Sequence, residues 1–190
     1  EVAPAGTIAE RVEQELVMVE KADKPHILDQ LLEKYKGTVL VFSRTKYGAK
    51  KLARAVRDRG HSAAEIHSNL SLSQRRKALE GFRSNKHRVL VATDIAARGI
   101  DVKNIELVVN YDLPDNPEDY VHRIGRTGRA GTPGRAITFI TPDQRSKVRL
   151  IERMAKGPLR VSQASRPSAQ RAAQRHTKRP AFRRRARVHV

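Results

Sequence analysis

The sequence predicts a three-layer α/β/α sandwich built on a mainly parallel sheet. Short apolar runs alternate along the chain with segments whose apolar residues recur at helical spacing, which is typical of successive β-α-β units. Two of the runs, Val-Leu-Val-Phe at 39–42 and Val-Leu-Val-Ala at 89–92, are apolar at every position. Strands of this kind are buried on both faces, so we expect helices on both sides of the sheet.

The individual elements follow from the same patterns. Apolar runs predict strands at 16–19, 38–42, 63–66, 89–92, 107–109 and 136–140. Helical apolar spacing predicts helices at 24–34, 46–59, 71–83, 117–124 and 143–155. Ser71 and Asp143 are candidate N-caps of two of these helices, because short polar side chains accept hydrogen bonds from the first helical turn.

Length and charge indicate one domain with a linker before it and a tail after it. The 190 residues suffice for one compact domain. We expect a linker at 1–11, a folded domain at 12–156, and a basic, disordered tail at 157–190, which has few large apolar residues. The formal charge is +19, and residues 156–190 contribute 11 Lys or Arg and no acid. The tail is either a solubilising end or a tether for a polyanionic partner, and we favour the tether.

Composition argues against several classes of protein. The chain has no cysteine, so neither a disulfide framework nor a thiolate zinc site is expected. Its seven histidines lack the spacing of a metal-binding helix, and we expect no metal held by its side chains. No apolar run approaches the roughly 18 residues of a membrane span. We therefore expect a cytoplasmic protein with no membrane partner.

Polar residues follow four of the predicted strands, at the point where each strand ends. These segments are Ser43 to Lys46, His67 to Asn69, Thr93 with Asp94, and Asn110 to Asp112. In open parallel sheets, ligands bind in the crevice beyond the carboxyl ends of the strands. The sequence therefore predicts one functional rim at this edge of the sheet.

An arginine-rich and glycine-rich segment provides the strongest functional signal. It reads His-Arg-Ile-Gly-Arg-Thr-Gly-Arg-Ala-Gly at 122–131. Arg126 and Arg129 lie three residues apart, so their guanidinium groups can project the same way if the helical turn continues. The planar fork of donors on arginine suits phosphate oxygens. The segment is thus a candidate anion clamp, the alternative being a solvated basic loop.

This segment resembles the His-Arg-Ile-Gly-Arg-x-Gly-Arg motif of DEAD-box helicases, a branch of helicase superfamily 2. The stretch Ala-Thr-Asp-Ile-Ala-Ala-Arg-Gly-Ile-Asp at 92–101 is similar to a second motif of that family, and Val-Phe-Ser-Arg-Thr-Lys at 41–46 resembles a third. The order and spacing agree over residues 12–155, and His122 favours the DEAD-box branch over its relatives. The resemblance implies the carboxyl-terminal RecA-like lobe of an ATP-dependent RNA helicase of bacterial type with a basic tail.

The resemblance also implies roles for individual residues around the ATP site. Arg126 and Arg129 would be catalytic and meet the ATP γ-phosphate, with Arg129 as the arginine finger, and Asp101 would bind the ribose. His122 and Arg98 would couple this lobe to the first lobe. The alternatives are a turn residue for Asp101 and an exposed helix histidine for His122.

RNA would lie along the rim, on residues that the same resemblance implies as contacts: Thr45, Ser68, Asn69, Arg75, Thr93 and Asp94. Thr93 and Asp94 are alternatively cap residues of a helix from Ile95, and Arg75 is alternatively a solvated helix charge. The chain departs from the family by having Ser68-Asn69 in place of Gly-Asp and Leu72 in place of glutamine. We expect these departures to alter RNA affinity.

The sequence lacks a phosphate-binding Gly-x-x-x-x-Gly-Lys-Ser/Thr loop and an Asp-Glu-Ala-Asp segment. ATP with Mg²⁺ would then be held by an N-terminal lobe of the same parent chain, and we expect this chain to be inactive alone. Because it begins with Glu1, we expect it to start inside a longer polypeptide. The competing interpretation is a non-enzymatic RNA-binding or annealing module that uses the lobe and the tail.

Overall fold

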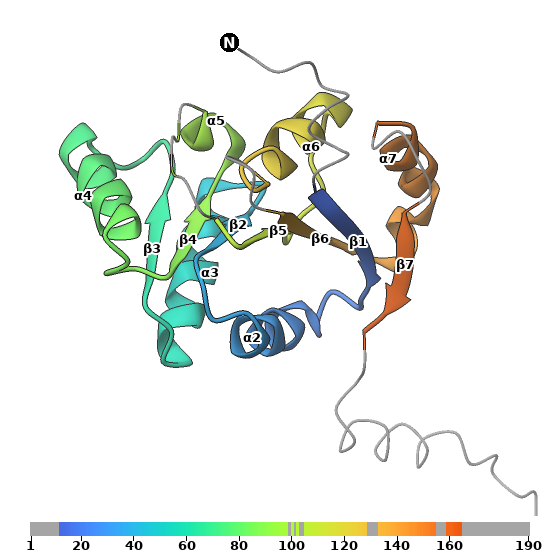
Figure 1. The fold of residues 1–190 in the computed structure, drawn as a ribbon, viewed down its shortest axis with the longest axis horizontal. Helices are drawn as coiled ribbons and strands as arrows, with labels where there is room; N and C mark the ends of the chain where they lie inside the picture. The colour runs from blue at the N-terminus through green and yellow to red at the C-terminus, as the bar shows by residue number, and fades with distance from the viewer. Residues whose placement is uncertain are drawn as a thin grey trace, which may run out of the picture.

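A computed structural model describes residues 12–98, 100, 102, 105–128, 133–154 and 159–164 of the chain. Figure 1 shows a central sheet with helices packed on both of its faces. The seven strands pair in parallel in the order β3-β4-β2-β5-β6-β1-β7. They are β1 (Val12–Met18), β2 (Val39–Phe42), β3 (Ala63–Ile66), β4 (Val89–Ala92), β5 (Leu107–Asn110), β6 (Gly134–Ile140) and β7 (Arg160–Gln163). The predicted fold class is confirmed.

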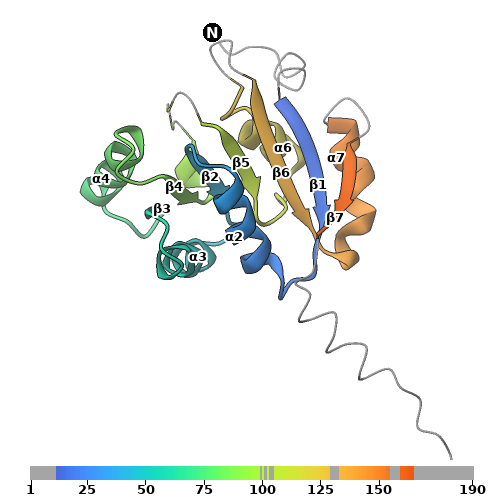
Figure 2. The same cartoon turned by 60° about the horizontal axis from the view of Figure 1, so that its bottom comes forward.

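Helices cover the two faces of the sheet unequally. They are α2 (Lys24–Lys34), α3 (Lys46–Asp58), α4 (Leu72–Arg83), α5 (Asp94–Ala97), α6 (Pro117–Ile124), the 3₁₀ helix η1 (Pro142–Lys147) and α7 (Val148–Met154). Helices α2 and α3 pack on one face with Val39 and Val41 of β2, whereas α4, α5 and α6 pack on the other with Leu40 and Phe42. This division follows from the alternation of side chains along a strand. Figure 2 shows α2 before the sheet and α6 behind it.

Ser71 caps α4 as predicted, because its Oγ accepts from Gln74 N at 3.2 Å while Gln74 Oε1 accepts from Ser71 N at 2.9 Å. The predicted N-cap at Asp143 is wrong. A 3₁₀ helix precedes α7, and Thr141 occupies its N-cap position. Thr141 N donates to Gln144 Oε1, so this arrangement places Asp143 inside the first turn.

The predicted tail begins too early, because residues 160–163 form the edge strand β7. This strand pairs in parallel with residues 15–18 of β1, and Ser162 Oγ donates to Glu15 Oε1 at 2.6 Å. Three of its four residues are exposed, so the sequence carries no apolar run that would mark a strand. The predicted linker at 1–11 and the rest of the predicted tail from 165 lie outside the described residues.

A buried tyrosine makes the fold sensitive to alkaline pH. Tyr120 of α6 is 1% exposed and its hydroxyl donates to Gln14 Oε1 at 2.9 Å. Burial raises the pKa of Tyr120 to about 12. The folded state therefore favours the neutral phenol, and the stability that this provides is complete below about pH 10 and disappears as the pH rises to about 12.

We expect the free energy of unfolding to fall by about 2 kcal/mol across this window through Tyr120 alone. Urea unfolding at pH values from about 9 to 12 measures this loss, and Tyr120→Phe should make the decline shallower. Burial also raises the pKa of Tyr111 to about 12, so part of the decline remains in that variant. Tyr47 is 71% exposed and provides the control, because Tyr47→Phe should leave the decline unchanged. An equal slope in both variants would contradict this account.

Candidate functional site

The carboxyl ends of the strands meet at one rim, as predicted, and Asp112 ties three of the chain segments there together. Asp112 follows β5, and its Oδ2 accepts from Ser43 Oγ at 3.2 Å and from Arg44 N at 3.1 Å, both of which follow β2. Its Oδ1 lies 3.2 Å from Lys24 Nζ at the start of α2. Lys24 is buried and also donates to the Tyr111 carbonyl at 2.7 Å. These contacts fix the loops that follow β2 and β5.

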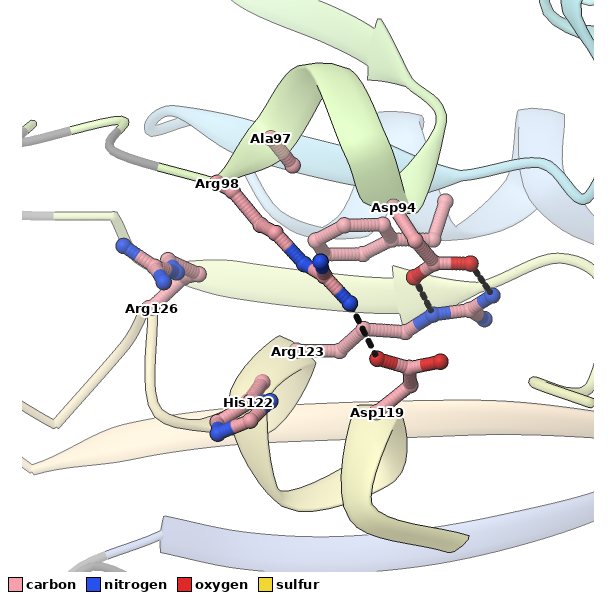
Figure 3. A pocket seen from close by; sticks show the side chains of 8 residues that line it. Asp94, Ala97, Arg98, Asp119, His122, Arg123 and Arg126 are labelled. Carbon is pink, nitrogen blue, oxygen red and sulfur yellow. Dashed lines mark hydrogen bonds and ion pairs between the residues drawn. The ribbon is translucent and has the colours of Figure 1, made fainter. Parts of the chain in front are cut away.

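Arg123 of α6 is the buried anchor of the rim. Only 1% of its surface is exposed. Its Nε donates to Asp94 Oδ1 at 2.6 Å and its Nη2 to Asp94 Oδ2 at 2.7 Å, a bidentate pair shown in Figure 3. Its Nη1 donates to the Asp112 carbonyl at 2.6 Å, and its guanidinium lies 5.0 Å from the Phe42 ring centroid. One side chain therefore joins α6 to the ends of β2, β4 and β5.

A pocket of about 170 Å³ lies between α5 and α6, beside this anchor. Its lining combines four basic and two acidic side chains with Phe42 and Ala97: Asp94, Arg98, Asp119, His122, Arg123 and Arg126. Figure 3 shows Arg98 reaching from the end of α5 toward Asp119 of α6, with Nη2 3.7 Å from Asp119 Oδ1. The structure thus brings together four of the predicted site residues, Asp94, Arg98, His122 and Arg126.

Arg126 follows α6 in a loop that packs against β6. Its Nη1 donates to the Ile100 carbonyl at 2.9 Å, which holds the half-buried side chain beside the pocket. The buried Thr127 hydroxyl donates to the Ile105 carbonyl. Gly128 has φ of +69°, and a Cβ on Gly134 would lie 2.2 Å from Gly128 N. Glycine at both positions therefore allows the loop to turn and to approach β6 closely.

Residues 23–131 match the family described as the helicase conserved C-terminal domain. The chain belongs to this helicase family. It is 44% identical over 154 residues to the ATP-dependent RNA helicase CshA of Listeria monocytogenes, an alignment that covers 80% of this chain and 30% of that protein. It is 46% identical over 145 residues to the probable ATP-dependent RNA helicase MJ0669 of Methanocaldococcus jannaschii, covering 76% of this chain and 40% of that protein.

Solved structures agree with this assignment. The helicase lobe is similar to a DEAD box protein from Methanococcus jannaschii, with a TM-score of 0.75 at 44% identity over 83% of this chain and 43% of the other. It is also similar to the C-terminal domain of the DEAD-box protein Dbp5, with a TM-score of 0.73 at 29% identity over 88% of this chain and 98% of the other. The chain is therefore the carboxyl-terminal RecA-like lobe of a DEAD-box protein, spanning about a third of the length of the curated relatives it matches.

Of the remaining predicted RNA contacts in the helicase lobe, Thr45 follows β2, Ser68 and Asn69 follow β3, and Arg75 lies on α4. Thr45 is exposed, and its Oγ1 caps α3 by accepting from Gly48 N at 3.0 Å. Ser68 and Asn69 are exposed in the turn after β3. Arg75 is half-buried on α4. These positions form one edge, and their RNA role stays a prediction.

Two predicted RNA residues of the helicase lobe, Thr93 and Asp94, have a different environment. Thr93 is buried at the N-cap position of α5, where its side chain makes no capping hydrogen bond. Asp94 has both carboxylate oxygens engaged by Arg123. The role of Arg123 as the buried anchor could not be predicted, because the spacing of a basic motif does not indicate which of its arginines is buried. The remaining predicted residues, Asp101 and Arg129, lie outside the described residues.

The described residues of the helicase lobe contain no group of three or more His, Cys, Asp or Glu side chains that could hold a metal ion. In the same part of the chain, none of the helices combines the length and apolarity needed to cross a membrane.

Proposed function

We propose that this lobe forms the second half of an ATP-dependent RNA helicase that closes on a first lobe to hydrolyse ATP and to separate short RNA duplexes. The observation that carries the proposal is the pocket at the rim, where Arg126 lies beside Arg98 and His122 on a scaffold fixed by buried Arg123. A similar solved structure, S. cerevisiae Dbp5, is described as bound to RNA and ADP BeF3. It matches 87% of this chain at 29% identity with a TM-score of 0.72, which supports both ligands.

The arginines after α6 would act on the transferred phosphoryl group. Arg126 and Arg129 would donate to the oxygens of the γ-phosphate, where negative charge is stabilised in the transition state. Asp101 would accept hydrogen bonds from the ribose hydroxyls. Magnesium, when bound by residues of the first lobe, would neutralise charge on the phosphates. In this account the lobe completes an ATP site that it does not make by itself.

The Asp94–Arg123 pair provides a physical link between the two ligands. Asp94 follows Thr93 at the proposed RNA edge, and Arg123 precedes Arg126 on the chain segment that would contact ATP. Both oxygens of Asp94 are held by Arg123, so α5 and α6 are joined by a half-buried bidentate contact. His122 and Arg98, exposed at the pocket, would meet the first lobe. We infer that closure of the lobes aligns both edges through this pair.

Complex formation tests the proposal directly. The chain is mixed with a separately expressed first lobe, with a single-stranded RNA and with a non-hydrolysable ATP analogue, and the mixture is followed by analytical ultracentrifugation. We expect a complex of the two lobes only when both ligands are present. Binding of the chain to RNA that is unaffected by the first lobe and the nucleotide would instead favour a non-enzymatic RNA-binding module.

Asn69, which stands where the family has aspartate, gives a separate prediction. Asn69 Oδ1 accepts a hydrogen bond from Lys46 Nζ at 3.0 Å. Asn69→Asp would place a carboxylate beside this ammonium and neutralise its charge at the RNA edge. We expect weaker RNA binding and a plot of log affinity against log salt that is shallower by about 0.7, the effect of one phosphate contact.

Fluorescence anisotropy of RNA binding at several salt concentrations measures this slope. Asn69→Ser removes the acceptor amide without adding charge and provides the control, so its slope should match that of the wild type. A slope for Asn69→Asp equal to that of Asn69→Ser would contradict the role of charge at this position.

A further inference from the structure

The positive charge of the folded lobe is concentrated in one part of the fold. Residues 43–88 hold 13 Lys or Arg and 3 Asp or Glu, whereas the rest of residues 1–155 hold 15 and 17. The segment 43–88 contains α3, β3 and α4, and β3 is an edge strand of the sheet. This edge is therefore strongly basic, while the rest of residues 1–155 is slightly acidic.

The outer face of α3 carries the densest part of this charge. The helix buries its apolar side against the sheet through Ala49, Leu52, Ala53 and Val56. Lys46, Lys50 and Arg54 recur at every fourth position, so they form a row about 12 Å long on the helix surface. Lys51 lies next to this row. We call these four residues the α3 ridge.

Acidic side chains neutralise little of the α3 ridge. Among the described residues, the ion pair that the α3 ridge makes joins Arg54 Nε to Asp58 Oδ2 at 4.0 Å. Both side chains are more than two-thirds exposed, and such pairs contribute little. Like charges four residues apart on a helix are destabilising. The ridge thus presents several cations whose repulsion a polyanionic partner would relieve.

The α3 ridge is continuous with the proposed RNA edge. Its first residue, Lys46, donates to Asn69 in the turn after β3. Tyr47 follows at once, is 71% exposed, and has its ring centroid 5.3 Å from Lys46 Nζ. Exposed aromatic rings beside cationic grooves are how proteins bind single-stranded nucleic acid. The ridge therefore leads away from the rim along the side of the lobe.

We propose that the α3 ridge binds phosphates of the RNA that extends beyond the segment held at the rim. This inference rests on the proposed RNA function and names a second part of its RNA contact. A protein partner is less favoured, because the core of a protein interface is apolar and Tyr47 is the one large apolar side chain of α3 that is exposed. Contacts to phosphates carry no base code, so the ridge would lengthen the RNA site without adding sequence preference.

The test compares three variants of the full chain by fluorescence anisotropy with an unstructured RNA of about 20 nucleotides. The first is the triple variant Lys50→Gln, Lys51→Gln and Arg54→Gln, which keeps good helix formers. The second keeps the charge through Lys50→Arg, Lys51→Arg and Arg54→Lys. The matched control is the triple variant Lys147→Gln, Arg149→Gln and Arg153→Gln on η1 and α7, which lie at the opposite end of the sheet in Figure 1.

We expect neutralisation of the ridge to make the slope of log affinity against log salt shallower by about 2, the effect of three phosphates on a single strand. The charge-keeping variant and the α7 control should keep the wild-type slope. An unchanged slope in the ridge variant, or an equal loss in the α7 control, would overturn the inference and leave an acidic protein as the partner to test. A wild-type chain that fails to bind RNA even with the first lobe and the ATP analogue present would instead contradict the proposed function itself, and the inference with it.

Discussion

Arg126→Ala in the two-lobe protein is expected to lower kcat for RNA-stimulated ATP hydrolysis by about a thousandfold or more. Arginines that stabilise charge on a transferred phosphoryl group contribute about 10³ to 10⁵ in rate, or about 4 to 7 kcal/mol. Arg126 lines the rim pocket and is held there by its hydrogen bond to the Ile100 carbonyl. Arg126→Lys should remain impaired, because lysine keeps the charge but lacks the planar fork of donors.

The measurement is steady-state ATPase activity with saturating RNA, together with urea unfolding of each variant. Arg145 of η1 is exposed and away from the pocket, so Arg145→Ala provides a control that should keep wild-type activity. If Arg126→Ala has the urea midpoint of the wild type but a much lower kcat, the loss of activity comes from the chemical step and not from unfolding. Normal ATPase activity in both Arg126→Ala and Arg129→Ala would remove the arginines from the proposed mechanism.

Arg123→Met is expected to destabilise the lobe by about 2 to 3 kcal/mol, because it leaves the half-buried Asp94 carboxylate without its ion-pair partner. Arg123 is 1% exposed and also donates to the Asp112 carbonyl and lies over the Phe42 ring. A second substitution, Asp94→Leu, removes the stranded carboxylate, so the double variant should recover a large part of the lost stability.

Urea unfolding of the single and double variants measures this coupling. Arg98→Met is the matched control, since Arg98 lines the same pocket but its side chain is 73% exposed and 3.7 Å from Asp119. Its loss should cost less than about 1 kcal/mol. Equal losses for Arg123→Met and Arg98→Met would contradict the assignment of Arg123 as the buried anchor.

Strands that are buried on both faces could be predicted from the sequence, whereas the edge strand with exposed side chains could not. The strands at 39–42 and 89–92 are fully buried, so their apolar runs marked them clearly. Residues 160–163 form a strand with mostly exposed side chains, and their register depends on pairing with β1 rather than on their own pattern. The N-cap of η1 was misplaced because Thr141 and Asp143 are both cap-forming residue types two positions apart.

The rim likewise has features that the sequence predicts and features that it does not. Its position was predictable, because polar residues at the ends of parallel strands must meet at one edge. The hydrogen-bond and ion-pair partners of those residues could not be predicted from the sequence. Asp94 appears in the sequence as one more polar rim residue, yet its bond to Arg123 joins positions 29 residues apart. Lys24 reaches Asp112 over 88 residues, which local spacing does not encode.

RNA-stimulated ATPase activity of the chain, of a separately expressed first lobe, and of their mixture tests the central claim most directly. The lobe places Arg126 at a pocket of the rim, but its sequence lacks the glycine-rich lysine loop that holds a triphosphate. We therefore predict that neither lobe alone hydrolyses ATP at an RNA-stimulated rate and that the mixture does. RNA-stimulated hydrolysis by this chain alone, or none in a mixture whose lobes associate, would contradict the account.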